Sequence, residues 1–83
     1  MENKKRILIA DAGETFRRLL SDAISRENDL EVAGETGNGR EAVDMTRELV
    51  PDVVVMDMVL SDLDGVPVLR EMCPLDPRPR ILV

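Results

Sequence analysis

The stretch PDVVVMDMVLSDLDG, residues 51–65, sets the expectations for the whole fold. Residues 53–57 begin with three valines, and an apolar β-branched run of this length is typical of a strand buried on both faces. Pro51 comes before the run and ends any preceding helix. SDLDG at 61–65 predicts a turn. We therefore expect a central strand that places Asp57 at its carboxyl end.

Strand and helix patterns alternate on either side of this segment. Further strands are predicted at 6–11, 30–35 and 81–83, and helices over 14–28, over 40–50 and from Pro67 onward. The first helix has an apolar face made of Phe16, Leu19, Leu20, Ala23 and Ile24. This alternation predicts a doubly wound α/β fold in which a parallel sheet carries helices on both faces. If the strand order is 2-1-3-4, as in flavodoxin-like folds, the first and third strands are neighbours.

The composition limits the classes of function. The chain has 83 residues, which is enough for one domain, so we expect residues 1–83 to form a single domain with no second one. Its net charge of −6 and its single aromatic residue, Phe16, argue against nucleic-acid binding. No apolar run is long enough to span a membrane. Cys73 is the only cysteine and is interpreted as a small buried or half-buried hydrophobic residue, so a reducing cytoplasm is the expected location.

Two aspartates close neighbouring strands of the predicted sheet. Asp11 ends the first strand and Asp57 ends the third, and these strands flank the point where the strand order reverses. Two carboxylates that meet there repel each other unless a cation lies between them. Mg²⁺ prefers oxygen ligands, so the sequence predicts a magnesium site. The alternative is that both are ordinary exposed aspartates at strand ends.

The chain resembles the receiver domains of bacterial response regulators. PDVVVMDMVLSDLDG is similar to their phosphoacceptor region, and ILIAD at 7–11 to their first strand and acidic pocket. Within that family, the chain resembles in particular the receivers of regulators that control sporulation in endospore-forming Firmicutes. DLEVAGE at 29–35, NGREAV at 38–43 and LDGVPVL at 63–69 support this finer likeness.

The resemblance implies a signalling role and no enzymatic activity. Asp57 would accept a phosphoryl group from phosphohistidine on a histidine kinase or phosphotransfer protein. Asp11, Asp57 and the backbone carbonyl of Val59 would bind Mg²⁺. The phosphorylated receiver would then control an output, expected to be transcriptional, that this chain does not carry.

The sequence also departs from the family pattern. Ala12 occupies the position at which receivers usually have a second acidic residue, normally the more important metal ligand. Glu14 is nearby, but a longer side chain two residues further on is a poor substitute. Receivers also continue beyond their fourth strand with a phosphate-sensing hydroxyl, a lysine, a fifth strand and two helices. We therefore expect a receiver truncated after Val83.

Two other functions fit parts of the sequence. Residues 37–42 match G-x-G-x-x-A, a dinucleotide-binding pattern, but they follow the second strand instead of the first. We expect Gly37 and Gly39 to allow left-handed backbone in a turn instead. The second alternative is a pseudo-receiver that acts through protein contacts without phosphorylation, which the loss of an acidic residue at Ala12 favours. Magnesium binding would separate this alternative from a phosphoacceptor.

The last strand suggests self-association. ILV at 81–83 would leave an apolar strand edge, and such edges pair with other chains. We expect a homodimer formed by pairing of residues 80–83 or by exchange of the last strand through the proline-rich hinge 74–79.

In the turn before the third helix, Asp62 is interpreted as a solvated loop charge and Asp64 as a turn or N-cap residue.

Overall fold

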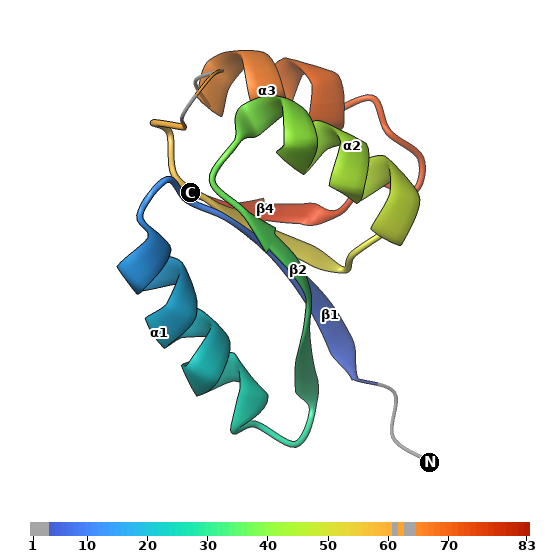
Figure 1. Cartoon of the computed structure of the whole chain (residues 1–83). Helices are drawn as coiled ribbons and strands as arrows, with labels where there is room; N and C mark the ends of the chain where they lie inside the picture. Colours follow the sequence, from blue (N-terminus) through green and yellow to red (C-terminus); the bar gives the residue numbers. More distant parts are fainter. Residues whose placement is uncertain (1–3, 61, 63–64) are drawn as a thin grey trace.

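The strands of the computed structural model form one parallel sheet in the order β2-β1-β3-β4. The structure describes residues 4–60, 62 and 65–83. Its elements are β1 (Lys5–Ala10), α1 (Glu14–Ser25), β2 (Leu30–Thr36), α2 (Gly39–Leu49), β3 (Val53–Met56), α3 (Gly65–Met72) and β4 (Arg80–Leu82). Figure 1 shows α1 on one face of the sheet and the pair α2 and α3 on the other. The flavodoxin-like fold and strand order predicted from the sequence are confirmed.

The central strands divide the core into two parts. Because side chains alternate along a strand, successive residues of β1 and β3 point to opposite faces. One set packs beneath α2 and α3 together with Val43, Val68 and Met72, and its strand members are Leu8, Ala10, Val54 and Met56. The other set, which includes Ile7 and Ile9, packs with Ile24 of α1. Burial on both faces explains why these strands are apolar runs in the sequence.

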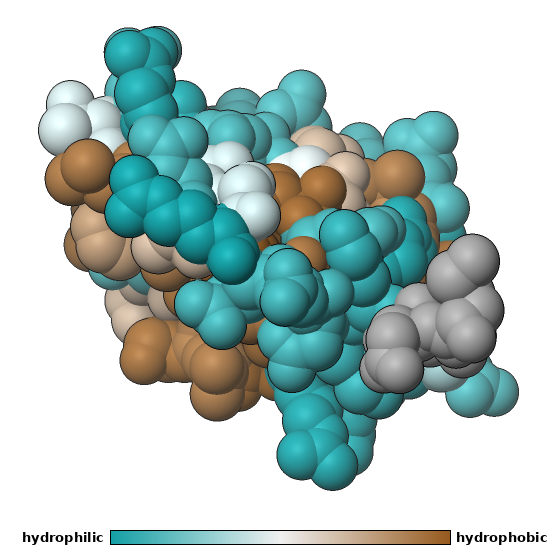
Figure 2. Space-filling model, turned by 90° about the horizontal axis from the view of Figure 1, so that it is seen from below, coloured by the Kyte–Doolittle hydropathy of each residue, from teal (hydrophilic) through white to brown (hydrophobic). Residues whose placement is uncertain are grey.

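The packing of α1 differs from the prediction. Phe16 is 50% exposed and Leu19 is 63% exposed, so the predicted apolar face is not buried as a whole. Only Ile24 of this helix is buried, and Leu20 is half-buried. In the described chain α1 is the only helix on its face of the sheet, and it contacts mainly β2. Figure 2 shows hydrophobic side chains at several places on the face of the molecule seen there, with the broadest area at the lower left.

Smaller expectations also change. The first helix ends at Ser25 instead of residue 28, and the third begins at Gly65, before Pro67. Cys73, which follows the last residue of α3, is exposed instead of buried or half-buried.

Ion pairs join α2 to α3 on the outer surface. Arg40 donates two side-chain hydrogen bonds to Glu71, at 2.7 and 3.1 Å. Arg47 lies 3.9 Å from the same carboxylate. The hydrogen bond from Arg40 lowers the pKa of Glu71 below its ordinary value and raises the pKa of Arg40. The contact links two helices whose apolar sides pack on the same face of the sheet.

This pair predicts a pH-dependent difference in stability. Because the pKa of Glu71 is lowered on folding, its contribution is present above the ordinary value of 4.5 and is lost as the pH falls below it. Glu71→Gln should therefore lower the melting temperature slightly at pH 7, and the difference from the native chain should shrink when the melts are repeated at a pH below 4.5. Glu48→Gln is the control, since Glu48 forms no ion pair within the described residues. Parallel melts followed by circular dichroism at both pH values measure the effect, and an equal difference at both would contradict it.

Candidate functional site

The carboxyl ends of β1 and β3 bring the two predicted aspartates together. Ala10 pairs with Met56 in the parallel ladder, and the backbone N–H of Asp57 donates to the Ala10 carbonyl at 2.8 Å. Asp11 and Asp57 therefore follow neighbouring strand ends and line the same hollow of about 380 Å³. Asp57 is exposed and Asp11 is half-buried. The placement agrees with the prediction that these strands flank the reversal of strand order.

Backbone and side-chain contacts fix the loop that carries Asp11. Its N–H donates to the carbonyl of Thr36 on β2 at 2.9 Å, and its carboxylate accepts from the N–H of Gly13 at 2.8 Å. Its own carbonyl accepts a hydrogen bond from the Arg17 guanidinium at 2.5 Å. Arg17 also lies 3.5 Å from Glu35, so α1 and the end of β2 are tied to this loop.

Gly37 occupies the turn beside this loop for a steric reason. No glycine in the described chain has a positive φ, so the expectation of left-handed backbone at Gly37 and Gly39 was wrong. A Cβ at Gly37 would instead lie 2.7 Å from the Arg17 guanidinium. The absence of a side chain at this position leaves room for Arg17 to reach the Asp11 carbonyl.

A second loop of the site begins directly after Asp57. The N–H of Val59 lies 3.4 Å from one carboxylate oxygen of Asp57, and the Val59 side chain is 66% exposed. The other carboxylate oxygens of Asp57 and Asp11 accept no hydrogen bond from the described residues. One oxygen of each aspartate is therefore open to a ligand.

The carboxylate oxygens of Asp11 and Asp57 fit a magnesium ion that has few protein ligands. Mg²⁺ prefers oxygen and commonly binds through one or two carboxylates with several waters. Within residues 4–60, 62 and 65–83, no group of three or more His, Cys, Asp or Glu residues is placed to hold a metal. Glu14 lies 3.8 Å from Arg18 and lines a different hollow, so it does not supply the carboxylate that Ala12 lacks.

Asp62 has a contact that the sequence did not indicate. Its carboxylate accepts from the backbone N–H groups of Gly39 at 2.6 Å and Arg40 at 3.2 Å, the first two residues of α2. The side chain of Asn38 accepts from the next N–H, that of Glu41, at 2.7 Å. Asp62 is thus exposed but is not merely a solvated loop charge. The interpretation of Asp64 as an N-cap lies outside the described residues.

Loss of the Asp62 carboxylate should destabilise the domain. Asp62→Ala leaves two N–H groups of the first turn of α2 without their acceptor, which costs about 1 kcal/mol for a helix cap of this kind. For a domain of this size that corresponds to a melting temperature lower by roughly 4–8 °C. Asp62→Asn keeps one acceptor oxygen and should lose less. Thermal melts compare the variants, and equal melting temperatures for Asp62→Ala and the native chain would contradict the role of this contact.

Comparison with known proteins agrees with this architecture. Residues 7–83 match the family model of the response regulator receiver domain. The chain belongs to the response regulator receiver domain family. It is 42% identical over 79 residues to the chemotaxis protein CheY of Thermotoga maritima, and this match covers 95% of the chain and 65% of that protein. It is 41% identical over 69 residues to a protein-glutamate methylesterase/protein-glutamine glutaminase of Syntrophomonas wolfei, covering 83% of the chain and 20% of that protein.

A solved receiver structure has the same fold as this chain. The crystal structure of the response regulator domain of Thermotoga maritima CheB superposes with a TM-score of 0.88 at 33% identity. That match covers 95% of this receiver and 58% of the CheB chain. The receiver therefore spans less than two thirds of the length of these relatives. No helix in the described part of the chain is long and apolar enough to cross a membrane. Because the chain belongs to the receiver family, the comparison argues against dinucleotide binding by residues 37–42.

Proposed function

We propose that this receiver accepts a phosphoryl group on Asp57. The observation that carries the proposal is the exposed Asp57 carboxylate at the end of β3, beside Asp11 at the end of β1. An oxygen of Asp57 would attack the phosphorus of a phosphohistidine. The phosphorus–nitrogen bond would break, and its electron pair would return to the histidine of the donor. The donor is a histidine kinase or a phosphotransfer protein.

The surrounding residues hold the acceptor and supply the metal ligands. Asp11, Asp57 and the carbonyl of Val59 would hold Mg²⁺, which when bound neutralises charge between an anionic acceptor and an anionic donor. The contacts of the Asp11 loop with Gly13, Thr36 and Arg17 keep the first carboxylate at the strand end. The hydrogen bond from Asp57 N–H to the Ala10 carbonyl keeps the second one beside it.

The wider setting is also a proposal. We place the receiver in the cytoplasm as a non-enzymatic switch of a two-component or phosphorelay system. Its output is proposed to be transcriptional, and the likeness of residues 29–35 and 38–43 to sporulation regulators supports this choice. One relative is a chemotaxis protein and another is a methylesterase, so the family serves more than one kind of output. A homodimer formed through β4 completes the proposal.

One observation favours a second candidate function. Ala12 leaves two carboxylates where the family usually has three, and the described residues place no third acidic residue beside them. A pseudo-receiver that signals by protein contact alone would tolerate this loss. In that case the region around Asp57 would respond neither to magnesium nor to phosphoryl donors.

Magnesium titration tests the choice between them. In ¹⁵N-edited spectra, MgCl₂ in the millimolar range should shift the amide signals of Asp11, Asp57 and Val59, and Asp57→Ala should abolish the shifts. Asp22→Ala is the matched control, because Asp22 is an exposed aspartate that lines a separate hollow on α1. Its spectrum should respond as the native chain does. An absence of shifts in the native chain, or equal shifts in Asp57→Ala, would favour the pseudo-receiver.

A further inference from the structure

Basic residues without ion-pair partners lie together at the amino ends of the strands, at the opposite end of β3 from Asp57. Six described basic residues form no ion pair within the described chain: Lys4, Lys5, Arg26, Arg70, Arg78 and Arg80. Three of them, Lys5, Arg78 and Arg80, line one hollow of about 490 Å³ beside the amino ends of β1, β3 and β4. Lys4 is the neighbour of Lys5 in the chain. This concentration of charge occurs in a protein whose net charge is −6.

Half of the eight residues that line this hollow are apolar. Val50, Val53 and the prolines Pro51 and Pro77 line the same hollow. Asp52 is its only acidic lining residue, and its carboxylate already accepts from the backbone N–H of Arg6 at 2.8 Å. The volume lies in the range of about 300–1,000 Å³ that is usual for ligand sites. The hollow therefore offers separated positive charges around an apolar surface.

Val50, which lines this hollow, has a strained backbone conformation. Its backbone has φ 47° and ψ 59°, and it is the only non-glycine residue with positive φ in the described chain. Left-handed backbone is unfavourable for a β-branched residue, and such conformations are concentrated at functional sites. The conformation directs the chain from α2 into Pro51 and leaves the Val50 side chain 46% exposed. An exposed apolar group thus lines the same hollow as the cations.

We propose that this hollow binds an acidic, extended segment of a partner protein. Carboxylates of the segment would pair with Lys5, Arg78 and Arg80, and an apolar side chain between them would rest on Val50. Nucleic acid fits less well, because the apolar wall offers nothing to a phosphate backbone and the protein as a whole is acidic. The site lies at the opposite end of the strands from Asp57, so it is independent of the proposed phosphoacceptor chemistry.

A labelled peptide tests the proposal on the full chain. The probe is a fluorescein-labelled eight-residue peptide in which glutamate and leucine alternate, and binding is followed by fluorescence anisotropy at low salt. The double variant Arg78→Gln and Arg80→Gln should weaken binding roughly tenfold, as expected for the loss of two exposed ion pairs. The matched control is Arg26→Gln with Arg70→Gln, which removes the same charge from exposed arginines elsewhere. It should bind as the native chain does, and circular dichroism melts verify that both double variants are folded.

Each remaining outcome decides the question. Failure of the native chain to bind the peptide, or equal weakening in the two double variants, would overturn the proposal. A peptide with glutamine in place of glutamate should not bind, and equal binding would show that charge is irrelevant. Tighter binding of polyuridylate than of the acidic peptide would assign the hollow to nucleic acid instead. Competition by inorganic phosphate at the same concentration as the peptide would identify a simple anion site and would also overturn the proposal.

Discussion

Incubation of this receiver with acetyl phosphate and Mg²⁺ is expected to label Asp57 only slowly, and Ala12→Asp should increase the rate of labelling roughly tenfold or more. Phosphoryl transfer depends on charge neutralisation and positioning, so the number of metal ligands limits the rate. The native site has two carboxylates, and Glu14 does not supply a third. Ala12 is exposed and adjacent to Asp11, so an aspartate side chain has room there. Intact-mass spectrometry at successive times measures the labelled fraction.

Two controls separate metal binding from other effects of the substitution. Ala12→Asn has nearly the same size as Ala12→Asp but lacks the charge, and it should label about as slowly as the native chain. Asp57→Asn in the Ala12→Asp background should abolish labelling. Rapid and stoichiometric labelling of the native chain would contradict the prediction. An unchanged rate in Ala12→Asp would mean that position 12 does not act on the acceptor site.

The sequence was sufficient to predict the fold because its central strands, β1 and β3, are buried on both faces. A run such as residues 53–56 has no polar position, so it fits only an interior strand, and the intervening helical patterns then require parallel crossovers. The same reasoning placed Asp11 and Asp57 at neighbouring strand ends, because the position of a residue at the end of a strand does not depend on side-chain packing. The structure agrees on both points.

Other features depended on contacts between distant residues. Asp62 lies more than twenty positions beyond the N–H groups of Gly39 and Arg40 that it accepts from, and no local pattern connects them. The apolar periodicity of α1 correctly predicted a helix. It did not show how much of the apolar face would be covered, because that depends on which elements share its side of the sheet. Phe16 therefore proved to be half-exposed and to line the hollow beside Asp57.

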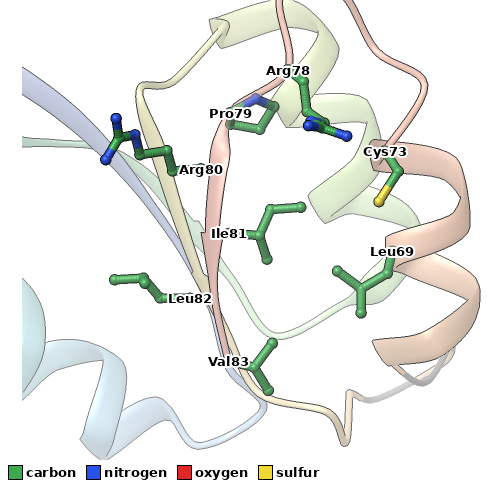
Figure 3. A pocket seen from close by; sticks show the side chains of 8 residues that line it. All are labelled: Leu69, Cys73, Arg78, Pro79, Arg80, Ile81, Leu82 and Val83. Carbon is green, nitrogen blue, oxygen red and sulfur yellow. The ribbon is translucent and has the colours of Figure 1, made fainter.

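Size-exclusion chromatography with light scattering is expected to give a mass close to twice the 9.3 kDa of one chain. β4 is one of the two edge strands of the described sheet and has only three residues. Leu82 is 58% exposed and Val83 is 74% exposed. Figure 3 shows Ile81 and Val83 facing Leu69 and Cys73 across an open hollow of about 600 Å³. A core of this size supplies only roughly 3–5 kcal/mol, so covering this surface would matter to stability.

The hydrogen-bonding pattern of β4 suits pairing with a second copy. Arg80 donates its N–H to the Asp52 carbonyl at 3.0 Å, so Arg80 points its backbone groups toward β3. Because these groups alternate in direction along a strand, the N–H and C=O of Ile81 point to the open side. Antiparallel pairing about a twofold axis at Ile81 would satisfy both groups in both copies. It would also set Arg80 opposite Leu82, which avoids like charges facing each other.

Substitution of a charged residue at this edge should separate the copies. Leu82→Lys introduces charge on the edge strand, a feature that opposes strand pairing, and should give a mass near 9.3 kDa. Leu19→Lys is the matched control, because Leu19 is a similarly exposed leucine on α1, and it should remain dimeric. If the last strand is instead exchanged through residues 74–79, mixed light and isotopically heavy chains should form mixed dimers only slowly, since exchange requires β4 to leave β3. A native chain that elutes at 9.3 kDa at every concentration and melts cooperatively would contradict the dimer, because the exposed edge would then be stable without a partner.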